Sequence, residues 1–83
     1  MADTARRVVI TGASSGFGAA AVRAFADRGD RVWGTMRDVD ARNAAKKAGL
    51  EAYSSRIAIL EMDVTRDESV AQGFAGILAE GPI

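Results

Sequence analysis

Apolar residues follow two spacings in turn along this chain, and the alternation predicts strands followed by helices. Short apolar runs, typical of strands buried in a parallel sheet, occupy residues 7–11, 31–36 and 57–62. Each run precedes a segment in which apolar residues recur every three or four positions, the spacing of an amphipathic helix. Three such units predict an α/β fold whose parallel sheet has right-handed crossovers.

Glycine and capping residues indicate where the helices begin and end. The first helix is expected from residue 16 to about residue 28, with Gly29 ending it. Its apolar positions are Phe17, Ala21, Val22 and Phe25. The second helix is expected to lie close to the sheet through small residues, with Asp38 or Asp40 as its cap and Gly49 as its end. These small residues are Ala41, Ala44, Ala45 and Ala48.

The third helix has the pattern of a capping box, with Thr65 followed three residues later by Glu68. Its expected apolar face contains Val70, Phe74, Ile77 and Leu78. No repeat or linker interrupts the chain, so residues 1–83 are expected to form one unit.

Composition excludes several classes of function. The chain has 83 residues, 48% hydrophobic and 27% charged, and no apolar run long enough to span a membrane. Eleven basic residues balance eleven acidic ones, which gives no electrostatic reason to expect a nucleic-acid partner. Without cysteine or histidine the chain has no disulfide, no Cys/His metal site and no histidine-dependent triad. Residues 1–7 lack a signal-peptide core, so a soluble cytoplasmic protein is expected.

A glycine-rich turn joins the first strand to the first helix. Gly12 allows a sharp turn, Gly16 leaves room for a phosphate to approach the backbone, and Gly18 allows close packing of the helix on the sheet. Free amides and the helix dipole make such a turn an anion site. Ser14 and Ser15 are candidates for hydroxyl contacts to phosphate, although serine is also common in turns. The alternative is a tight connection without a ligand.

The pattern Thr11-Gly12-x-x-x-Gly16-x-Gly18 resembles the cofactor fingerprint of the short-chain dehydrogenase/reductase family. It differs from the Gly-x-Gly-x-x-Gly spacing of other dinucleotide enzymes and lacks the ending of a P-loop. The resemblance covers the first half of the family's domain. It implies a Rossmann-type three-layer α/β/α fold in which residues 1–83 are the N-terminal dinucleotide-binding half. The cofactor-binding residues that it implies in the turn are Gly12, Ser14, Ser15, Gly16, Phe17 and Gly18.

The end of the second predicted strand is expected to select the coenzyme. Along the family pattern, the position that is acidic in NAD-preferring members falls on Met36, and Arg37 follows it. An arginine there favours the 2′-phosphate of NADP, so NADP is expected rather than NAD. Two observations leave NAD open. Asp38 lies close to the usual distance of about 20 residues beyond the glycine motif, so it is the ribose-binding acid if the strand ends one or two residues later. Ser15 stands where many NADP-using relatives have a basic residue. A solvated Arg37 without a ligand is the remaining alternative.

Asp63 and Val64, at the end of the third predicted strand, resemble the family's adenine-binding pair. The resemblance implies that the carboxylate accepts a hydrogen bond from the adenine amino group and that Val64 contacts the ring. The alternative is that Asp63 caps the following turn, a common role for aspartate.

The family's chemistry is hydride transfer between a nicotinamide and an alcohol or carbonyl carbon, with a Tyr-x-x-x-Lys pair for proton transfer. The only tyrosine here is Tyr53, and Ile57 stands four residues later. No catalytic residue is therefore assigned. Tyr53 is expected to be a partly buried aromatic residue before the third strand. The chain alone is expected to be inactive, with the substrate side in the missing half.

The family's strand order, 3-2-1-4, implies that the strand containing Val8, Val9 and Ile10 lacks a neighbour on one side here. An apolar open edge favours pairing with another chain, so the polypeptide is expected to be a fragment of a longer enzyme or to self-associate. Family members commonly form homo-oligomers. Two other functions remain open: a non-catalytic nucleotide-binding module of this length, and an adenosyl-cofactor domain of the methyltransferase type, which the glycine spacing disfavours.

Overall fold

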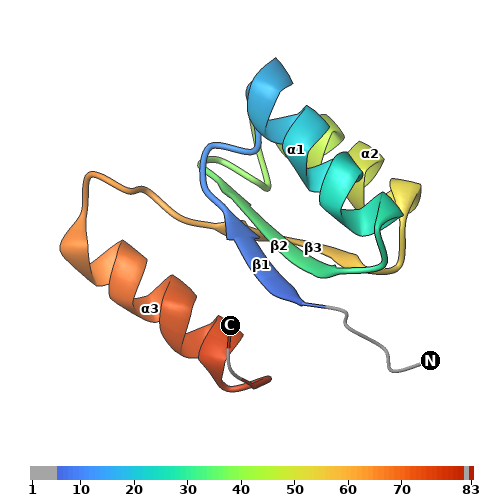
Figure 1. The fold of residues 1–83 in the computed structure, drawn as a ribbon. Coiled ribbons are helices and arrows are strands. Elements are labelled where there is room, and N and C mark those ends of the chain that lie inside the picture. The colour runs from blue at the N-terminus through green and yellow to red at the C-terminus, as the bar shows by residue number, and fades with distance from the viewer. Residues whose placement is uncertain (1–5, 82) are drawn as a thin grey trace.

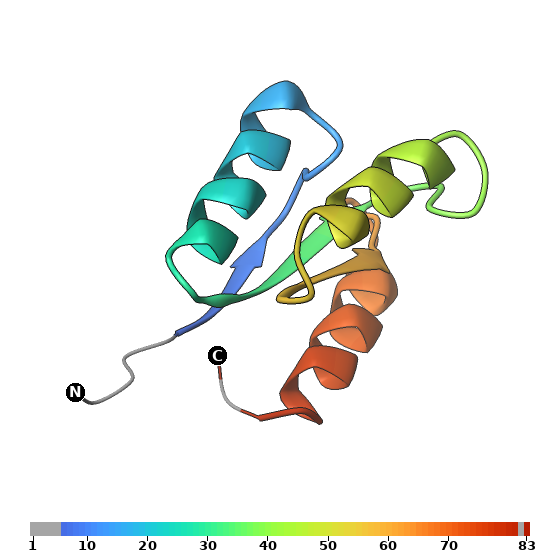
Figure 2. The same ribbon diagram turned by 90° about the vertical axis from the view of Figure 1, so that its right-hand side faces the viewer.

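The computed structural model describes residues 6–81 and residue 83. Residues 1–5, which make up most of the segment in which no signal-peptide core is expected, lie outside this range. The elements follow in the order β1 (Arg7–Ile10), α1 (Gly16–Asp27), β2 (Arg31–Met36), α2 (Ala44–Tyr53), β3 (Ile57–Glu61) and α3 (Asp67–Leu78). The strands are parallel and form a sheet in the order β1-β2-β3. Helices α1 and α2 cover one face and α3 covers the other (Figures 1 and 2). The predicted α/β fold class is confirmed.

The main hydrophobic core lies between the sheet and the α1–α2 layer. Side chains alternate along a strand, which places Val32 and Met36 of β2 on this face. Gly34 lies between them, and a Cβ there would come within 2.9 Å of Ile59 and 3.0 Å of Ala13. The absence of a side chain therefore lets the layers approach. The buried cluster consists of Ala13, Val22, Ala26, Val32, Met36, Val39, Leu50, Ile57 and Ile59.

The opposite face of the sheet is centred on Trp33, which is fully buried. The guanidinium carbons of Arg7 and Arg31 lie 5.6 and 5.0 Å from the centre of its ring, so two cations stack on this aromatic side chain. On α3, Ile77 is fully buried, whereas Leu78, expected on the same apolar face, is 54% exposed. The described helices include none that is long and apolar enough to cross a membrane.

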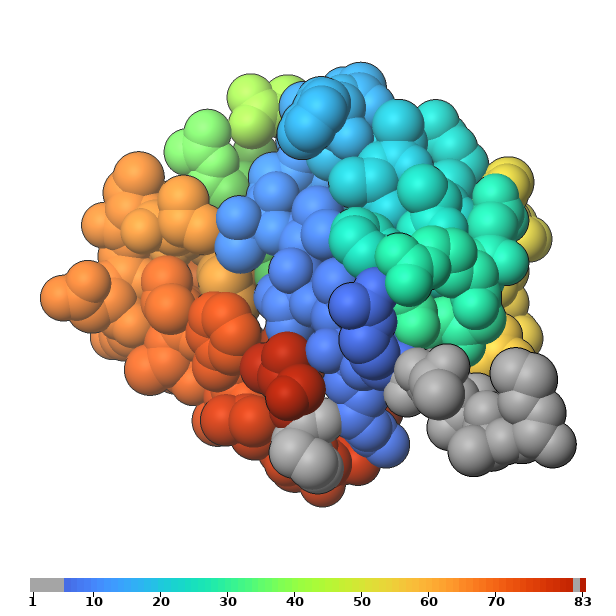
Figure 3. Space-filling view, in the orientation of Figure 1, coloured from blue at the N-terminus to red at the C-terminus, as the bar shows by residue number. Residues whose placement is uncertain are grey.

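Strand β1 forms an outer edge of the described sheet because it pairs with β2 alone. Its residues Val8, Val9 and Ile10 are half-buried. Figure 3 shows the surface of β1 between those of α1 and α3. The edge position expected for this strand is thus observed.

Helix α2 differs from its sequence-based prediction in both its boundaries and its buried face. It runs through Gly49 to Tyr53, and its N-cap is Asn43 rather than Asp38 or Asp40. The only buried residue of the helix is Leu50, while the expected small-residue stripe is exposed. Burying one leucine contributes about 1.5–3 kcal/mol, much more than one alanine methyl group does, so Leu50 determines which face meets the sheet.

Two further sequence-based expectations were wrong. Tyr53 is the last residue of α2 rather than part of a connection, and it is 48% exposed. Its hydroxyl donates to the Asp27 carboxylate at 3.0 Å, which raises the pKa of Tyr53. The capping box fails because the Thr65 hydroxyl donates to Asp63 at 2.6 Å, and α3 begins only at Asp67.

Candidate functional site

The glycine-rich turn leaves β1 through Gly12, whose φ of 71° lies in the left-handed region that favours glycine. The next amide, from Ala13, donates to the carbonyl oxygen of Thr35 at 2.8 Å. This bond attaches the turn to β2. The sharp turn expected at Gly12 is confirmed, and its position is fixed by the sheet.

Ser15 is the N-cap of α1. Its hydroxyl accepts from the Gly18 amide at 3.0 Å and donates to the Gly12 carbonyl oxygen at 3.1 Å. The side chain that was a candidate for phosphate contact therefore holds the turn together. Among the residues that the structure describes, the amides of Gly16 and Phe17 have no acceptor. They are the free donors expected at a helix N-terminus, where an anion is favoured.

The last two glycines of the turn have different surroundings. A Cβ at Gly18 would overlap the carbonyl oxygen of Gly12, so this glycine allows the first turn of α1 to lie against the loop. Gly18 was expected to allow packing against the sheet, and this was wrong, because its neighbours are the loop residues Gly12 and Ala13. A Cβ at Gly16 would meet no atom within 4 Å. The space beside Gly16 is open to a ligand.

A cavity of about 240 Å³ lies at the carboxyl ends of the strands. It brings together five of the predicted site residues, from three separate parts of the chain. Phe17, in contrast, is 89% exposed and lines no described cavity, and Gly18 is buried beneath the turn. The cavity is lined by Gly12, Ser14, Thr35, Met36, Arg37, Met62, Asp63, Val64 and Thr65.

Arg37 is exposed at the end of β2, on a loop that other side chains hold in place. The Asn43 amide group donates to the Arg37 carbonyl oxygen at 2.6 Å. The Glu61 carboxylate accepts from the amides of Asp38 and Val39, both at 3.1 Å. The loop therefore presents Arg37 to the cavity.

Asp38, the alternative ribose-binding acid, is not among the residues that line this cavity. Its φ is 54°, and its carboxylate lies 3.0 Å from the Arg42 guanidinium in an exposed ion pair. The carboxylate thus has a partner outside the candidate site.

Asp63 both caps a turn and lines the cavity. One carboxylate oxygen accepts from the Thr65 amide at 3.0 Å and from its hydroxyl at 2.6 Å. These two bonds, with smaller contributions from Arg37 and Arg66, lower the pKa of Asp63. The other carboxylate oxygen has no partner in residues 6–81 and 83. The charged group keeps an acceptor oxygen, and Val64 beside it is 60% exposed.

Sequence analysis missed two polar residues of this site. Thr35 is only 1% exposed, and its hydroxyl has no hydrogen-bond partner in the described part of the chain. Glu61, which holds the loop after β2, is the exposed last residue of β3. A hydroxyl or carboxylate interrupting an apolar strand near its carboxyl end was the available signal for both.

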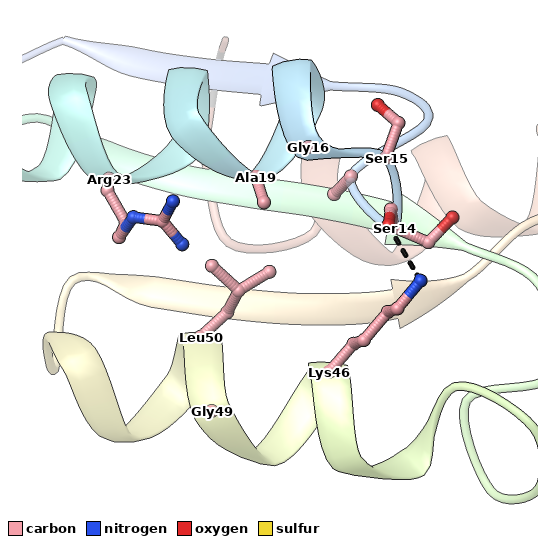
Figure 4. A pocket seen from close by; sticks show the side chains of 9 residues that line it. Ser14, Ser15, Gly16, Ala19, Arg23, Lys46, Gly49 and Leu50 are labelled. Carbon is pink, nitrogen blue, oxygen red and sulfur yellow. Dashed lines mark hydrogen bonds between the residues drawn. The ribbon is translucent and has the colours of Figure 1, made fainter.

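A second cavity, of about 480 Å³, lies between α1 and α2 (Figure 4). Ser14 lines both cavities, and Lys46 reaches from α2 to donate to the Ser14 carbonyl oxygen at 3.0 Å. The residues that line it are Ala13, Ser14, Ser15, Gly16, Ala19, Arg23, Lys46, Gly49 and Leu50.

A parallel sheet whose first strand leads through a glycine turn into a helix defines a Rossmann-like α/β arrangement. The family model for short chain dehydrogenases matches residues 6–81. The chain therefore belongs to the short-chain dehydrogenase family, as the glycine spacing implied.

Similar proteins agree with this assignment. Retinol dehydrogenase 8 of Bos taurus is 41% identical over 75 residues, which are 87% of this chain and 24% of that protein. A short-chain dehydrogenase from Streptomyces avermitilis superposes with a TM-score of 0.77 at 38% identity, covering 95% of this chain and 27% of the other. A short-chain dehydrogenase from Sphingobium yanoikuyae, solved with NADPH, gives 0.64 at 38% identity, covering 81% and 26%. The chain thus spans about a quarter of the length of these relatives.

Proposed function

We propose that this chain is the coenzyme-binding portion of an NADP-preferring oxidoreductase that transfers hydride between a nicotinamide and an alcohol or carbonyl carbon. Membership of the family and the NADPH complex of a similar protein support the class of coenzyme. The observation that carries the proposal is the single cavity that joins the glycine turn, Arg37 and Asp63. Ligands of open α/β sheets bind at this carboxyl edge.

The residues present fit a dinucleotide in several respects. The open space beside Gly16 and the free amides of Gly16 and Phe17 suit a diphosphate. The buried, unpartnered Thr35 hydroxyl also leaves a polar group in the cavity for a ligand to satisfy. When bound, the nicotinamide coenzyme would supply the hydride or accept it.

In this proposal the chain's own residues bind and orient the coenzyme. The free carboxylate oxygen of Asp63 accepts a hydrogen bond from the adenine amino group, and Val64 contacts the ring. The Ser14 hydroxyl lies in the cavity wall, where it is available to a phosphate oxygen. Arg37 binds the 2′-phosphate.

The preference for NADP over NAD is supported by the different surroundings of Arg37 and Asp38. Arg37 lines the cavity, while Asp38 pairs with Arg42 outside it. One charge-assisted hydrogen bond contributes about 1.5–3 kcal/mol, equivalent to roughly a tenfold to hundredfold difference in affinity.

An Arg37→Gln variant tests this preference by fluorescence titration with NADPH and NADH. The dissociation constant for NADPH should rise about tenfold to a hundredfold, while that for NADH stays within about twofold. The matched control is Arg56→Gln, which removes an exposed arginine that donates to the Gly29 carbonyl oxygen at 2.7 Å, outside both cavities. Equal wild-type affinities for the two coenzymes would remove the NADP assignment.

The alcohol or carbonyl substrate, the catalytic groups and a cytoplasmic location belong to the same proposal, and they rest on the family resemblance and the composition. A self-assembling nucleotide-binding module is the second candidate function. It is supported by the open β1 edge, since half-buried Val8, Val9 and Ile10 offer a strand for pairing.

A further inference from the structure

Lys46 connects α2 with the glycine-rich turn, 32 residues earlier in the sequence. It lies in the first turn of α2, and its ammonium group donates to the Ser14 carbonyl oxygen at 3.0 Å (Figure 4). Ser14 is the residue that lines both cavities. The side chain therefore brings a positive charge to the wall between them.

No ion pair neutralises this charge among the described residues. No carboxylate of the described residues lies within 4.0 Å of the Lys46 ammonium group, whereas the neighbouring Lys47 pairs with Glu51 at 2.9 Å. No acidic residue lines the larger cavity. The result is a cation in open contact with solvent and with the turn.

The two helices beside the cavity add to the same potential. Neither α1 nor α2 has an acidic residue in its first turn, while α3 has Asp67 and Glu68 there. A cation in a first turn also opposes the helix dipole. Positive potential thus collects around Ser14 from two helix N-termini and from Lys46, with Arg37 lining the neighbouring cavity. This charge distribution favours a phosphate group at the wall.

We propose that Lys46 is a coenzyme-specificity residue, which binds the 2′-phosphate of NADP together with Arg37; this inference rests on the proposed function. An ammonium group has three donors, and Ser14 takes one of them. Two remain for phosphate oxygens. The exposed side chain is free to turn toward the ligand without disturbing the core.

The test measures dissociation constants of the purified protein for NADPH and NADH by fluorescence titration at two salt concentrations. Lys46→Gln should weaken NADPH binding about fivefold and reduce its salt dependence, because one phosphate contact is lost. NADH binding should stay within about twofold. Lys46→Arg should retain most of the NADPH affinity, since it keeps the charge.

Arg56→Gln is again the matched control, because it removes the same charge and a similar bond to a backbone carbonyl oxygen elsewhere on the molecule. It should leave both affinities unchanged. If Lys46→Gln weakened NADPH and NADH equally, the residue would only support the turn, and the proposal would be overturned. Unchanged NADPH affinity in that variant would overturn it too.

The same titrations separate this inference from the proposed function. A wild-type protein that binds neither coenzyme would refute both. A wild-type protein whose NADPH binding depends on Arg37 and not on Lys46 would refute only the role of Lys46.

Discussion

Replacing Gly18 with alanine probes the contact between α1 and the glycine-rich turn. The added Cβ would overlap the Gly12 carbonyl oxygen and lie 3.1 Å from the Ala13 Cα. Both neighbours are backbone atoms, which cannot rotate away as the end of a flexible side chain can. The turn and the helix therefore have to separate.

The cost follows from three contributions. Overpacking costs about 1–3 kcal/mol. Weakening the hydrogen bond between the Gly18 amide and Ser15 costs up to about 1 kcal/mol more. Alanine recovers roughly 0.5–1 kcal/mol because it is a better helix former than glycine. The expected net loss in the free energy of unfolding is about 2 kcal/mol.

Two other glycines make the comparison specific, because a Cβ at Gly16 or Gly76 would meet no atom within 4 Å. Gly16→Ala should leave the free energy of unfolding nearly unchanged and weaken NADPH binding about tenfold or more, since the methyl group occupies the space proposed for the diphosphate. Gly76→Ala, in α3, should stabilise the fold by up to about 1 kcal/mol and leave binding unchanged.

Urea unfolding and NADPH titration of the three variants give both quantities. A Gly18→Ala protein as stable as the wild type would refute the steric reasoning. A Gly16→Ala protein with unchanged NADPH affinity would refute the placement of the diphosphate.

Two predictions concern the charge on Asp63 and the open edge of the sheet. Because hydrogen bonds from Thr65 lower the pKa of Asp63 in the folded state, their stabilising contribution is present above the unfolded value of about 4 and is lost as the pH falls through the folded pKa. Asp63→Asn should therefore unfold at a lower urea concentration than the wild type at pH 7, and the difference should disappear in acid; a gap independent of pH would contradict this. Residues 1–83 expressed alone should self-associate in light scattering and show no turnover with NADPH and simple carbonyl compounds; a monomer at high concentration or measurable turnover would contradict the respective expectation.

Much of the fold was predictable because the strands are short apolar runs between glycine and polar residues. The second strand was predicted with its observed bounds, and the first and third end one residue earlier than expected. The glycine turn was predictable from the glycine spacing between a predicted strand and a predicted helix, because Gly12 needs a left-handed φ and Gly18 needs contact without a side chain. The contact partner of Gly18 was not predicted.

The helix ends and the side-chain partners were less predictable, because they depend on competition between residues. Gly49 resembled a helix end, but Leu50 after it is anchored in the core and carries the helix onward. Thr65 resembled a helix cap, but its hydroxyl donates a hydrogen bond to Asp63, two residues earlier, instead of capping α3. A local sequence pattern does not show which of two competing residues ends a helix or accepts a hydrogen bond.

The residues of the candidate site also fall into those that the sequence indicated and those that only the packing reveals. Arg37 and Asp63 were selected by the family resemblance and because each follows a predicted strand, and such ends meet at one edge of a parallel sheet. Lys46 was not found, since only the packing of α2 beside α1 brings it to Ser14.

The exposed positions of Arg37 and Lys46 have a consequence for how such a protein can change. Surface substitutions away from the core usually alter stability by less than about 0.5 kcal/mol. In the proposed arrangement, a switch between the two coenzymes therefore needs only one or two replacements and no compensating change in the interior. Gly12 and Gly18 of the loop lack this freedom, because a side chain would strain the backbone at Gly12 and overlap the Gly12 carbonyl oxygen at Gly18. The choice of coenzyme can therefore change while the loop proposed to bind the diphosphate stays the same.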